Sequence, residues 1–169
     1  MKTILLCVET NPSAKTDQMY IEKTIKQLYT ITNEIKISYE YFDGKDKYNN
    51  AKLQKKINGL KRMSKNCQFV VIYCIDTDKI DMEVKMTEKY KEIKSFCDNK
   101  GFDLVWFYRD IEEVYYGHTI SKKDKIMEAK KFNNMDGLGK ATIQTLCAND
   151  LCRYKSNLLL VLDKYLTRK

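Results

Sequence analysis

The sequence predicts an α/β fold, with an open, mostly parallel four-stranded sheet flanked by helices. Strand-like and helix-like segments alternate over the first 108 residues, and the third strand-like segment is apolar throughout. No linker, repeat or low-complexity segment interrupts the chain. Such alternation indicates parallel strands joined by right-handed crossovers. A length of 169 residues suits one domain with a full core.

The first two strands and the helix between them follow from hydrophobic patterns. Residues 3–8 form a continuous apolar run, which predicts a buried strand. Residues 13–29 carry apolar side chains at helical spacing, with Ser13 as the expected N-cap. Residues 35–42 alternate and are rich in β-forming residues, so they predict a second strand that ends at the turn 43–44.

The next elements repeat this order. Residues 50–65 predict a basic amphipathic helix, and residues 67–75 (CQFVVIYCI) form the most apolar strand of the sequence. Unbroken apolarity is typical of a central parallel strand covered on both faces. Residues 82–99 predict another helix, and residues 102–108 a fourth strand.

The C-terminal part predicts helices only. A short helix follows the fourth strand, and three more are expected at residues 122–132, 141–148 and 154–166. We therefore expect an α/β core over residues 1–117 and a helical extension over residues 118–169 that packs on the same domain.

The amino-acid composition limits the binding partners and the cellular compartment that we expect for this chain. The chain has 31 Lys and Arg against 23 Asp and Glu, a net charge of +8, which favours a polyanion such as nucleic acid but also fits a lysine-rich solvated surface. Its six cysteines form no CxxC pair, which predicts reduced thiols and a cytoplasmic protein. No apolar stretch approaches the roughly 20 residues of a membrane helix, so no membrane contact is expected.

Acidic residues follow three of the predicted strands. Glu9 follows the first strand, Asp76 and Asp78 follow the third, and Glu113 lies in an acidic segment after the fourth. Parallel strands end at the same side of a sheet, so these carboxylates should gather there. Neighbouring carboxylates repel each other, and Mg²⁺ or Mn²⁺ would remove that cost. The other interpretation of the Asp-Thr-Asp segment is a helix-capping turn.

The chain lacks the sequence motifs of other common enzyme classes. It contains no glycine-rich phosphate loop, no HExxH and no GxSxG, and its single histidine gives little basis for a Ser-His-Asp site.

Two segments resemble the motifs of Toprim domains, the metal-binding modules of topoisomerases, primases and OLD-family nucleases. These domains carry a glutamate after the first strand and DxD after the third, as "LLCVET" (Glu9) and "VVIYCIDTDK" (Asp76, Asp78) do here. The segment "WFYRDIEEVYYG" is similar to the acidic segment of small RloB-like Toprim proteins, with Glu112 or Glu113 as the matching acid. The chain departs from the family in having Thr10 where a glycine is usual.

The resemblance covers roughly residues 3–117 and implies a Toprim-like (Rossmann-like) fold and a divalent-metal-dependent endonuclease acting on RNA or DNA. It implies Mg²⁺ or Mn²⁺ as the cofactor and, by family association, a role in antiphage defence. The implied metal ligands are Glu9, Asp76, Asp78 and Glu113. The implied catalytic residues are Glu9, Asp76, Asp78 and Lys79. The residues expected to hold the nucleic acid are Arg109, Tyr116, Lys55, Lys56, Lys122 and Lys123.

Two other functions fit the same pattern. The chain could be a Toprim-like binding module that docks on a partner such as an ATPase of a defence complex, because the glycine after Glu9 is missing. It could also be a receiver-like or nucleotide-binding domain, although a receiver should have paired acids after its first strand. The sequence leaves open the choice between RNA and DNA, the formation of a homo-oligomer and the need for a partner.

Overall fold

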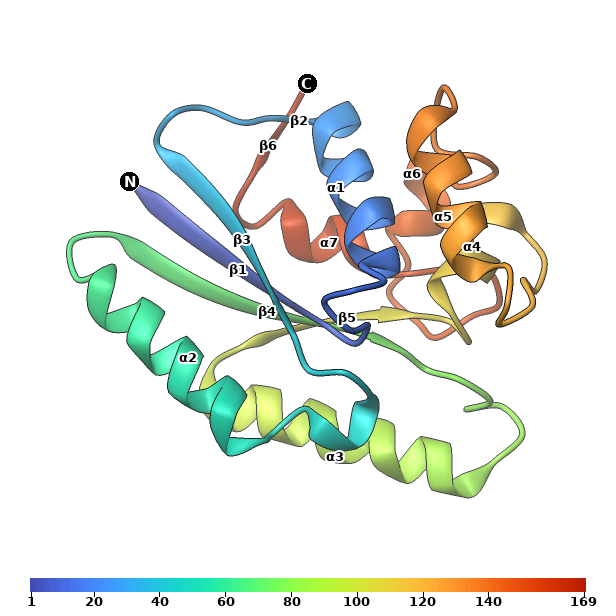
Figure 1. Ribbon diagram of the computed structural model, residues 1–169, viewed down its shortest axis with the longest axis horizontal. Coiled ribbons are helices and arrows are strands. Elements are labelled where there is room, and N and C mark those ends of the chain that lie inside the picture. Colours follow the sequence, from blue (N-terminus) through green and yellow to red (C-terminus); the bar gives the residue numbers. More distant parts are fainter.

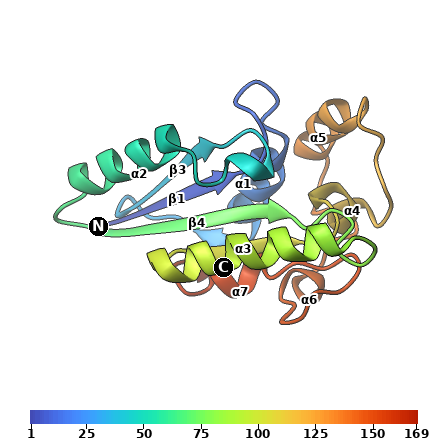
Figure 2. The same ribbon diagram turned by 90° about the horizontal axis from the view of Figure 1, so that it is seen from below.

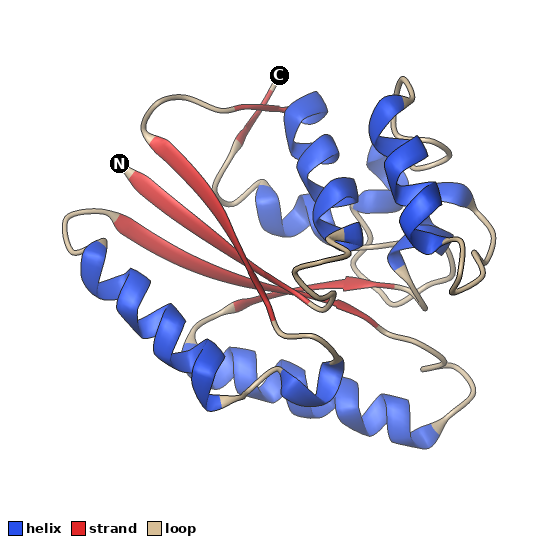
Figure 3. Ribbon diagram, in the orientation of Figure 1, coloured by secondary structure: helices blue, strands red, loops and turns tan.

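The computed structural model describes residues 1–169 and confirms the α/β class. Its main sheet has four parallel strands in the order β3-β1-β4-β5 (Figure 3). The bounds of these strands are β1 Lys2–Val8, β3 Ile35–Tyr41, β4 Gln68–Asp76 and β5 Asp103–Phe107. The predicted strands are therefore all present, and each begins and ends within two residues of the expected limits.

Helices cover both faces of the sheet (Figure 1). The longer ones are α1 Thr16–Leu28, α2 Ala51–Met63, α3 Val84–Lys100 and α5 Lys125–Asn134. The shorter ones are α4 Ile111–Tyr116, α6 Ile143–Leu146 and α7 Leu158–Leu162. Seen from below, α2 and α3 lie in front of the sheet (Figure 2), and α1 and the other helices cover the opposite face. No helix is both long and apolar enough to span a membrane.

Alternating strand residues divide the core between the two faces. Ile4 and Leu6 of β1 pack on the side of α1, whereas Leu5 and Cys7 pack on the side of α2 and α3. A strand with both sets of side chains buried must be apolar at every position, which explains the continuous apolar runs in β1 and β4.

The C-terminal segment belongs to the α1 side of this core. Phe132, Leu146 and Leu158 are fully buried in the same cluster as Ile4 of β1. Its last residues add a second, two-stranded antiparallel sheet, in which β2 (Tyr29–Thr30) pairs with β6 (Thr167–Arg168), a pairing that the sequence did not predict.

Three local predictions were wrong. The N-cap of α1 is Lys15 in a left-handed conformation, because Asn11 rather than Ser13 organises the preceding turn by accepting from the main-chain N–H groups of Ser13 and Ala14. The helices expected at 141–148 and 154–166 are reduced to α6 and α7, because residues 147–157 are irregular and residues 155–157 bond to β5 and to Tyr108 just after it.

Candidate functional site

The candidate site lies between β1 and β4, the two strands from which the sheet extends in opposite directions. After β1 the chain moves outward to β3 and then returns to β4 on the other side of β1. In open α/β sheets, the crevice at the carboxyl ends of two such strands is the usual ligand site. Glu9 follows β1 and Asp76 ends β4, and the Asp76 N–H donates to Glu9 Oε2 at 3.3 Å.

The turn after β4 is fixed by the end of β5. The N–H of Thr77 donates to the Phe107 carbonyl at 2.9 Å, and the N–H of Asp78 donates to the Arg109 carbonyl at 2.8 Å. Asp78 and Arg109 both have positive φ, +49° and +58°. A left-handed residue leaves the geometry of the strand, so the alternation rule that would align Asp78 with Asp76 stops at Asp76.

The two aspartates consequently have different partners. Asp76 Oδ1 accepts from the Ile111 N–H at the start of α4, at 3.0 Å. The exposed Asp78 carboxylate lies 2.5 Å from Lys45 Nζ, and this ammonium is also 3.9 Å from Glu9 Oε2. Lys45 belongs to a 3₁₀ turn, Lys45–Lys47, that follows β3. We call Glu9, Asp78 and Lys45 the outer group.

Behind it lies an inner group, Asp17, Asp76, Asp110, Glu112 and Lys125. Lys125 Nζ contacts Glu112 Oε2 at 2.8 Å and Asp110 Oδ2 at 3.4 Å. Asp17, in the first turn of α1, accepts from the Thr10 N–H at 3.2 Å.

Burial and mutual repulsion make this region hard to ionise. Burial, together with the charges of Asp17 and Glu9, raises the pKa of Asp76 well above its usual range. Burial and the charge of Glu112 raise the pKa of Asp17 to about 7. Burial also raises the pKa values of Glu9 and Glu112, with Lys45 and Lys125 respectively opposing the shift. Additional positive charge would therefore stabilise the ionised carboxylates.

A pocket of about 440 Å³ adjoins the outer group. It is lined by Asp78, Lys79, Glu83, Met86, Arg109, Asp110, Glu113 and Thr119. Glu113 is buried; its Oε1 accepts from the Thr119 hydroxyl at 2.5 Å, and its Oε2 has no partner. Lys79 and Arg109 are paired with Glu83 at 3.6 Å and Asp81 at 2.9 Å, so two cations and an unpartnered carboxylate oxygen share this space.

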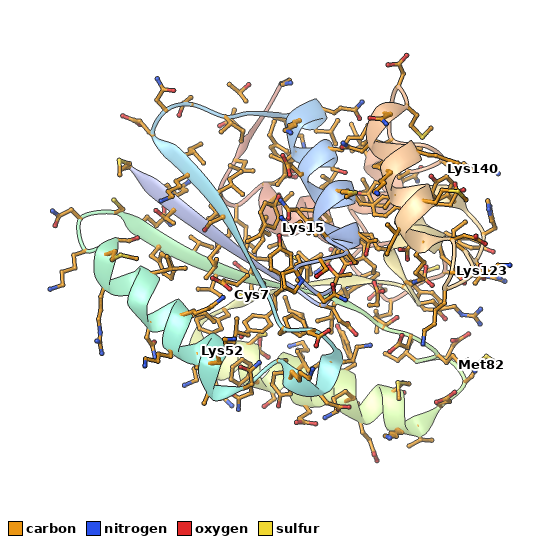
Figure 4. The ribbon with its side chains drawn as sticks, viewed as in Figure 1. Cys7, Lys15, Lys52, Met82, Lys123 and Lys140 are labelled. Carbon is orange, nitrogen blue, oxygen red and sulfur yellow. The ribbon has the colours of Figure 1, made fainter.

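The predicted nucleic-acid-binding residues do not form one surface. Lys55 and Lys56 lie on α2, whereas Lys122 and Lys123 precede α5 beyond the opposite face of the sheet. Figure 4 shows the separation through the labelled Lys52 of α2 and Lys123.

Two of the predicted residues have structural contacts. Lys56 is paired with Glu40 at 2.6 Å. The half-buried Tyr116 packs edge-on against Tyr20 and Phe132, and its hydroxyl donates to the Glu128 carbonyl at 2.9 Å. Tyr116 therefore contributes to an aromatic part of the core.

A second pocket, of about 340 Å³ and lined by three lysines, lies at the N-terminus of α2. Lys47, Lys52 and Lys56 line it together with Pro12 and Asn50, and Asn50 caps α2 by accepting from the Leu53 N–H. Like the acids, it lies at the carboxyl ends of the strands, because α2 begins where β3 ends.

The residues present suit a hard cation by their chemistry. The acids of the outer group offer carboxylate oxygens, which Mg²⁺ and Mn²⁺ prefer. Burial raises the pKa of Glu9 and of the neighbouring Asp76, so added positive charge would favour their ionised forms. However, no three Asp, Glu, His or Cys side chains converge as a ready set of ligands, and Lys45 lies between Glu9 and Asp78.

Sequence reasoning missed Asp17, Lys45 and Lys125. A signal for Asp17 existed, because the helix after a parallel strand begins at the same side of the sheet at which that strand ends. Lys45 begins a 3₁₀ turn and Lys125 begins α5, and each follows a loop whose path no hydrophobic pattern predicts.

Comparison of the chain with known protein families, curated proteins and solved structures gave no match.

Proposed function

We propose that this chain is a Mg²⁺- or Mn²⁺-dependent nuclease that hydrolyses phosphodiester bonds in RNA or DNA. The observation that carries the proposal is that Glu9, Asp76 and Asp78 all lie at the carboxyl ends of β1 and β4, with Lys45 as a local cation. The same chemistry is implied by the resemblance of these segments to Toprim motifs.

Glu9 and Asp78 would hold the cation, with Asp76 and Glu113 as further ligands. When bound, a divalent cation activates water and neutralises charge on a phosphodiester. For it to bind between Glu9 and Asp78, the Lys45 ammonium must move aside. The Asp78 side chain is 50% exposed, so its carboxylate stays solvated when the ammonium leaves.

The cationic side chains around the site would position the nucleic acid. Lys79 and Arg109 line the pocket beside Asp78 and would contact a phosphate there, where they offset its negative charge. Lys47, Lys52 and Lys56 would bind the neighbouring backbone phosphates at the N-terminus of α2.

The test is Mn²⁺ binding by calorimetry together with cleavage of labelled single- and double-stranded RNA and DNA. We expect Asp78→Asn with Glu9→Gln to weaken Mn²⁺ binding at least about tenfold, or about 1.4 kcal/mol, and to abolish cleavage. Both changes keep the shape of the side chain.

Asp43→Asn is the matched control. Asp43 is also an exposed aspartate with positive φ, +52°, but it pairs with Lys47 outside the outer group. Asn tolerates this conformation at both positions, so fold and stability should be kept in both proteins. Cleavage that survives loss of Glu9 and Asp78 would overturn the proposal, as would a wild-type protein that neither binds Mn²⁺ nor cleaves.

A second candidate is a binding module that docks on a partner protein, such as an ATPase. It is favoured by the absence of three converging ligands and by the position of Lys45, which already supplies a cation to Glu9 and Asp78. This function predicts that a partner binds equally well with and without divalent cation.

A further inference from the structure

One edge of the main sheet has no partner. In the β1–β3 ladder, the Lys2 N–H donates to the Glu34 carbonyl at 2.7 Å and the Phe42 N–H donates to the Val8 carbonyl at 3.1 Å. In a parallel ladder, only every second residue of a strand bonds to a given neighbour through its main chain. The main-chain N–H and C=O groups of the even-numbered residues of β3 therefore point to β1. The N–H and C=O groups of Ile37, Tyr39 and Tyr41 then point outward, and no hydrogen bond outside the ladder reaches them.

This edge has few of the features that protect free strands. β3 is seven residues long and contains no proline, glycine or bulge, with Lys36 as its only lysine. Long, regular edges pair readily with another strand unless charge, proline or a covering segment prevents it.

The sequence of β3 is complementary to itself when two copies run antiparallel about Ser38. Ile37 then lies opposite Tyr39 of the partner subunit, and both residues have the outward main-chain groups that form hydrogen-bonded pairs. Lys36 lies opposite Glu40 of the partner subunit, which adds an ion pair on either side of the axis. The registers centred on residue 37 or 39 keep the hydrogen bonds but lose this charge pairing.

Side chains on both faces of β3 support the same pairing. Ser38 Oγ and Tyr39 Oη are buried without hydrogen-bond partners. On the α1 side, a pocket of about 490 Å³ lies along β3. Ile25, Ile31, Ile37 and Tyr39 form its apolar surface, and Gln18, Glu22 and Lys26 form the rest of its lining. Ile31 is 42% exposed. A second β3 would place an isoleucine–tyrosine pair against this apolar surface, and the two Ser38 hydroxyls would meet at the axis.

We propose that two copies of this chain associate through β3 to form a symmetric dimer with one continuous sheet. The interface is isologous, so it closes as a two-fold pair and adds no further copies. Because the two β3 strands run antiparallel, the acidic sites lie at opposite ends of the joined sheet.

The charge pair gives the first test, by sedimentation velocity over a range of protein concentrations. Glu40→Lys places two lysines opposite each other at both ends of the contact, so we expect dimerisation to weaken at least about tenfold. Lys36→Glu should do the same, and the double variant Lys36→Glu/Glu40→Lys should restore dimerisation. Lys56→Met is the control, because Lys56 pairs with Glu40 within one chain.

A cysteine at the axis tests the register. Residues opposite each other in non-hydrogen-bonded pairs have Cα atoms about 4.5 Å apart, which a disulfide can span. Under mild oxidation, the Ser38→Cys variant should form a disulfide that joins position 38 of one copy to position 38 of the other, as identified by peptide mass. The Lys36→Cys variant, whose new thiol would face Glu40 of the partner subunit, should not link to itself.

Three results would overturn the proposal. The first is a wild-type protein that is monomeric at all concentrations, and the second is a dimer that neither charge reversal weakens. The third is a dimer of the Ser38→Cys variant that gives no disulfide between the two introduced thiols.

Discussion

The inner and outer groups of the candidate site both contain a lysine between carboxylates, but they differ in burial. The difference lies in the acids: the Glu112 side chain, which pairs with Lys125, is 1% exposed, whereas the Asp78 side chain, which pairs with Lys45, is 50% exposed. The lysines differ in the opposite sense, with Lys125 27% and Lys45 10% exposed. A buried charge that loses its partner cannot be rescued by water, but an exposed one can. The Glu112–Lys125 pair of the inner group therefore supports the fold, whereas in the outer group Asp78 can exchange its lysine for a ligand.

The largest expected effect is the loss of Lys125. Lys125→Met leaves Glu112 buried without a counter-charge and should lower the free energy of unfolding by about 3–5 kcal/mol. Urea unfolding at neutral pH measures this loss. Lys45→Met, in the outer group, should cost less than about 1 kcal/mol.

A double variant separates charge from packing. Lys125→Met/Glu112→Gln removes both charges and should recover most of the lost stability. Equal losses for Lys125→Met and Lys45→Met would show that the two groups do not differ as their burial suggests.

The next-largest expected effect is a dependence of the free energy of unfolding on pH, which arises from Asp17. Its folded-state pKa of about 7 lies above the ordinary value of about 3.9, so the folded protein binds the proton more tightly. The resulting stabilisation is complete below about pH 4 and is lost as the pH rises through about 7. Asp17→Asn should therefore be more stable than the wild type above pH 7, by about 2–4 kcal/mol.

Thermal unfolding measured from acidic to mildly alkaline pH checks this difference. Glu83→Gln serves as the control, because Glu83 is exposed and pairs only with Lys79. A constant gap between Asp17→Asn and the wild type at all pH values would contradict the prediction.

The smallest expected effect concerns the competition between Lys45 and a divalent cation. If the ammonium must leave before the cation binds, Lys45→Met should tighten Mn²⁺ binding about threefold to fivefold, the equivalent of an exposed ion pair of up to about 1 kcal/mol. Calorimetry should compare Mn²⁺ binding by Lys45→Met with that by Lys47→Met. Lys47 belongs to the same 3₁₀ turn but pairs with Asp43. Weaker Mn²⁺ binding by Lys45→Met would mean that Lys45 supports the ligand instead of replacing it.

Much of the fold could be predicted, because hydrophobic periodicity reports burial. The four strands of the main sheet and the helices α1 to α5 were predicted from the sequence. The parallel arrangement then placed Glu9 and Asp76 at the carboxyl ends of neighbouring strands. The helices expected at 141–148 and 154–166 were overestimated, because the Ser156 and Asn157 side chains bond to the main chain of β5 and hold this part of the chain along that strand.

The sequence by itself determined the class of the fold and the side of the sheet on which the acids gather. Both follow from which residues are apolar and from the direction of parallel strands. Only the tertiary structure decided which cation faces which acid, through Lys45 and Lys125, and which sheet edge stays open. Ser156 and Asn157 cover β5, whereas nothing covers β3, because such contacts depend on the path of loops in space and leave no periodic signal in the chain.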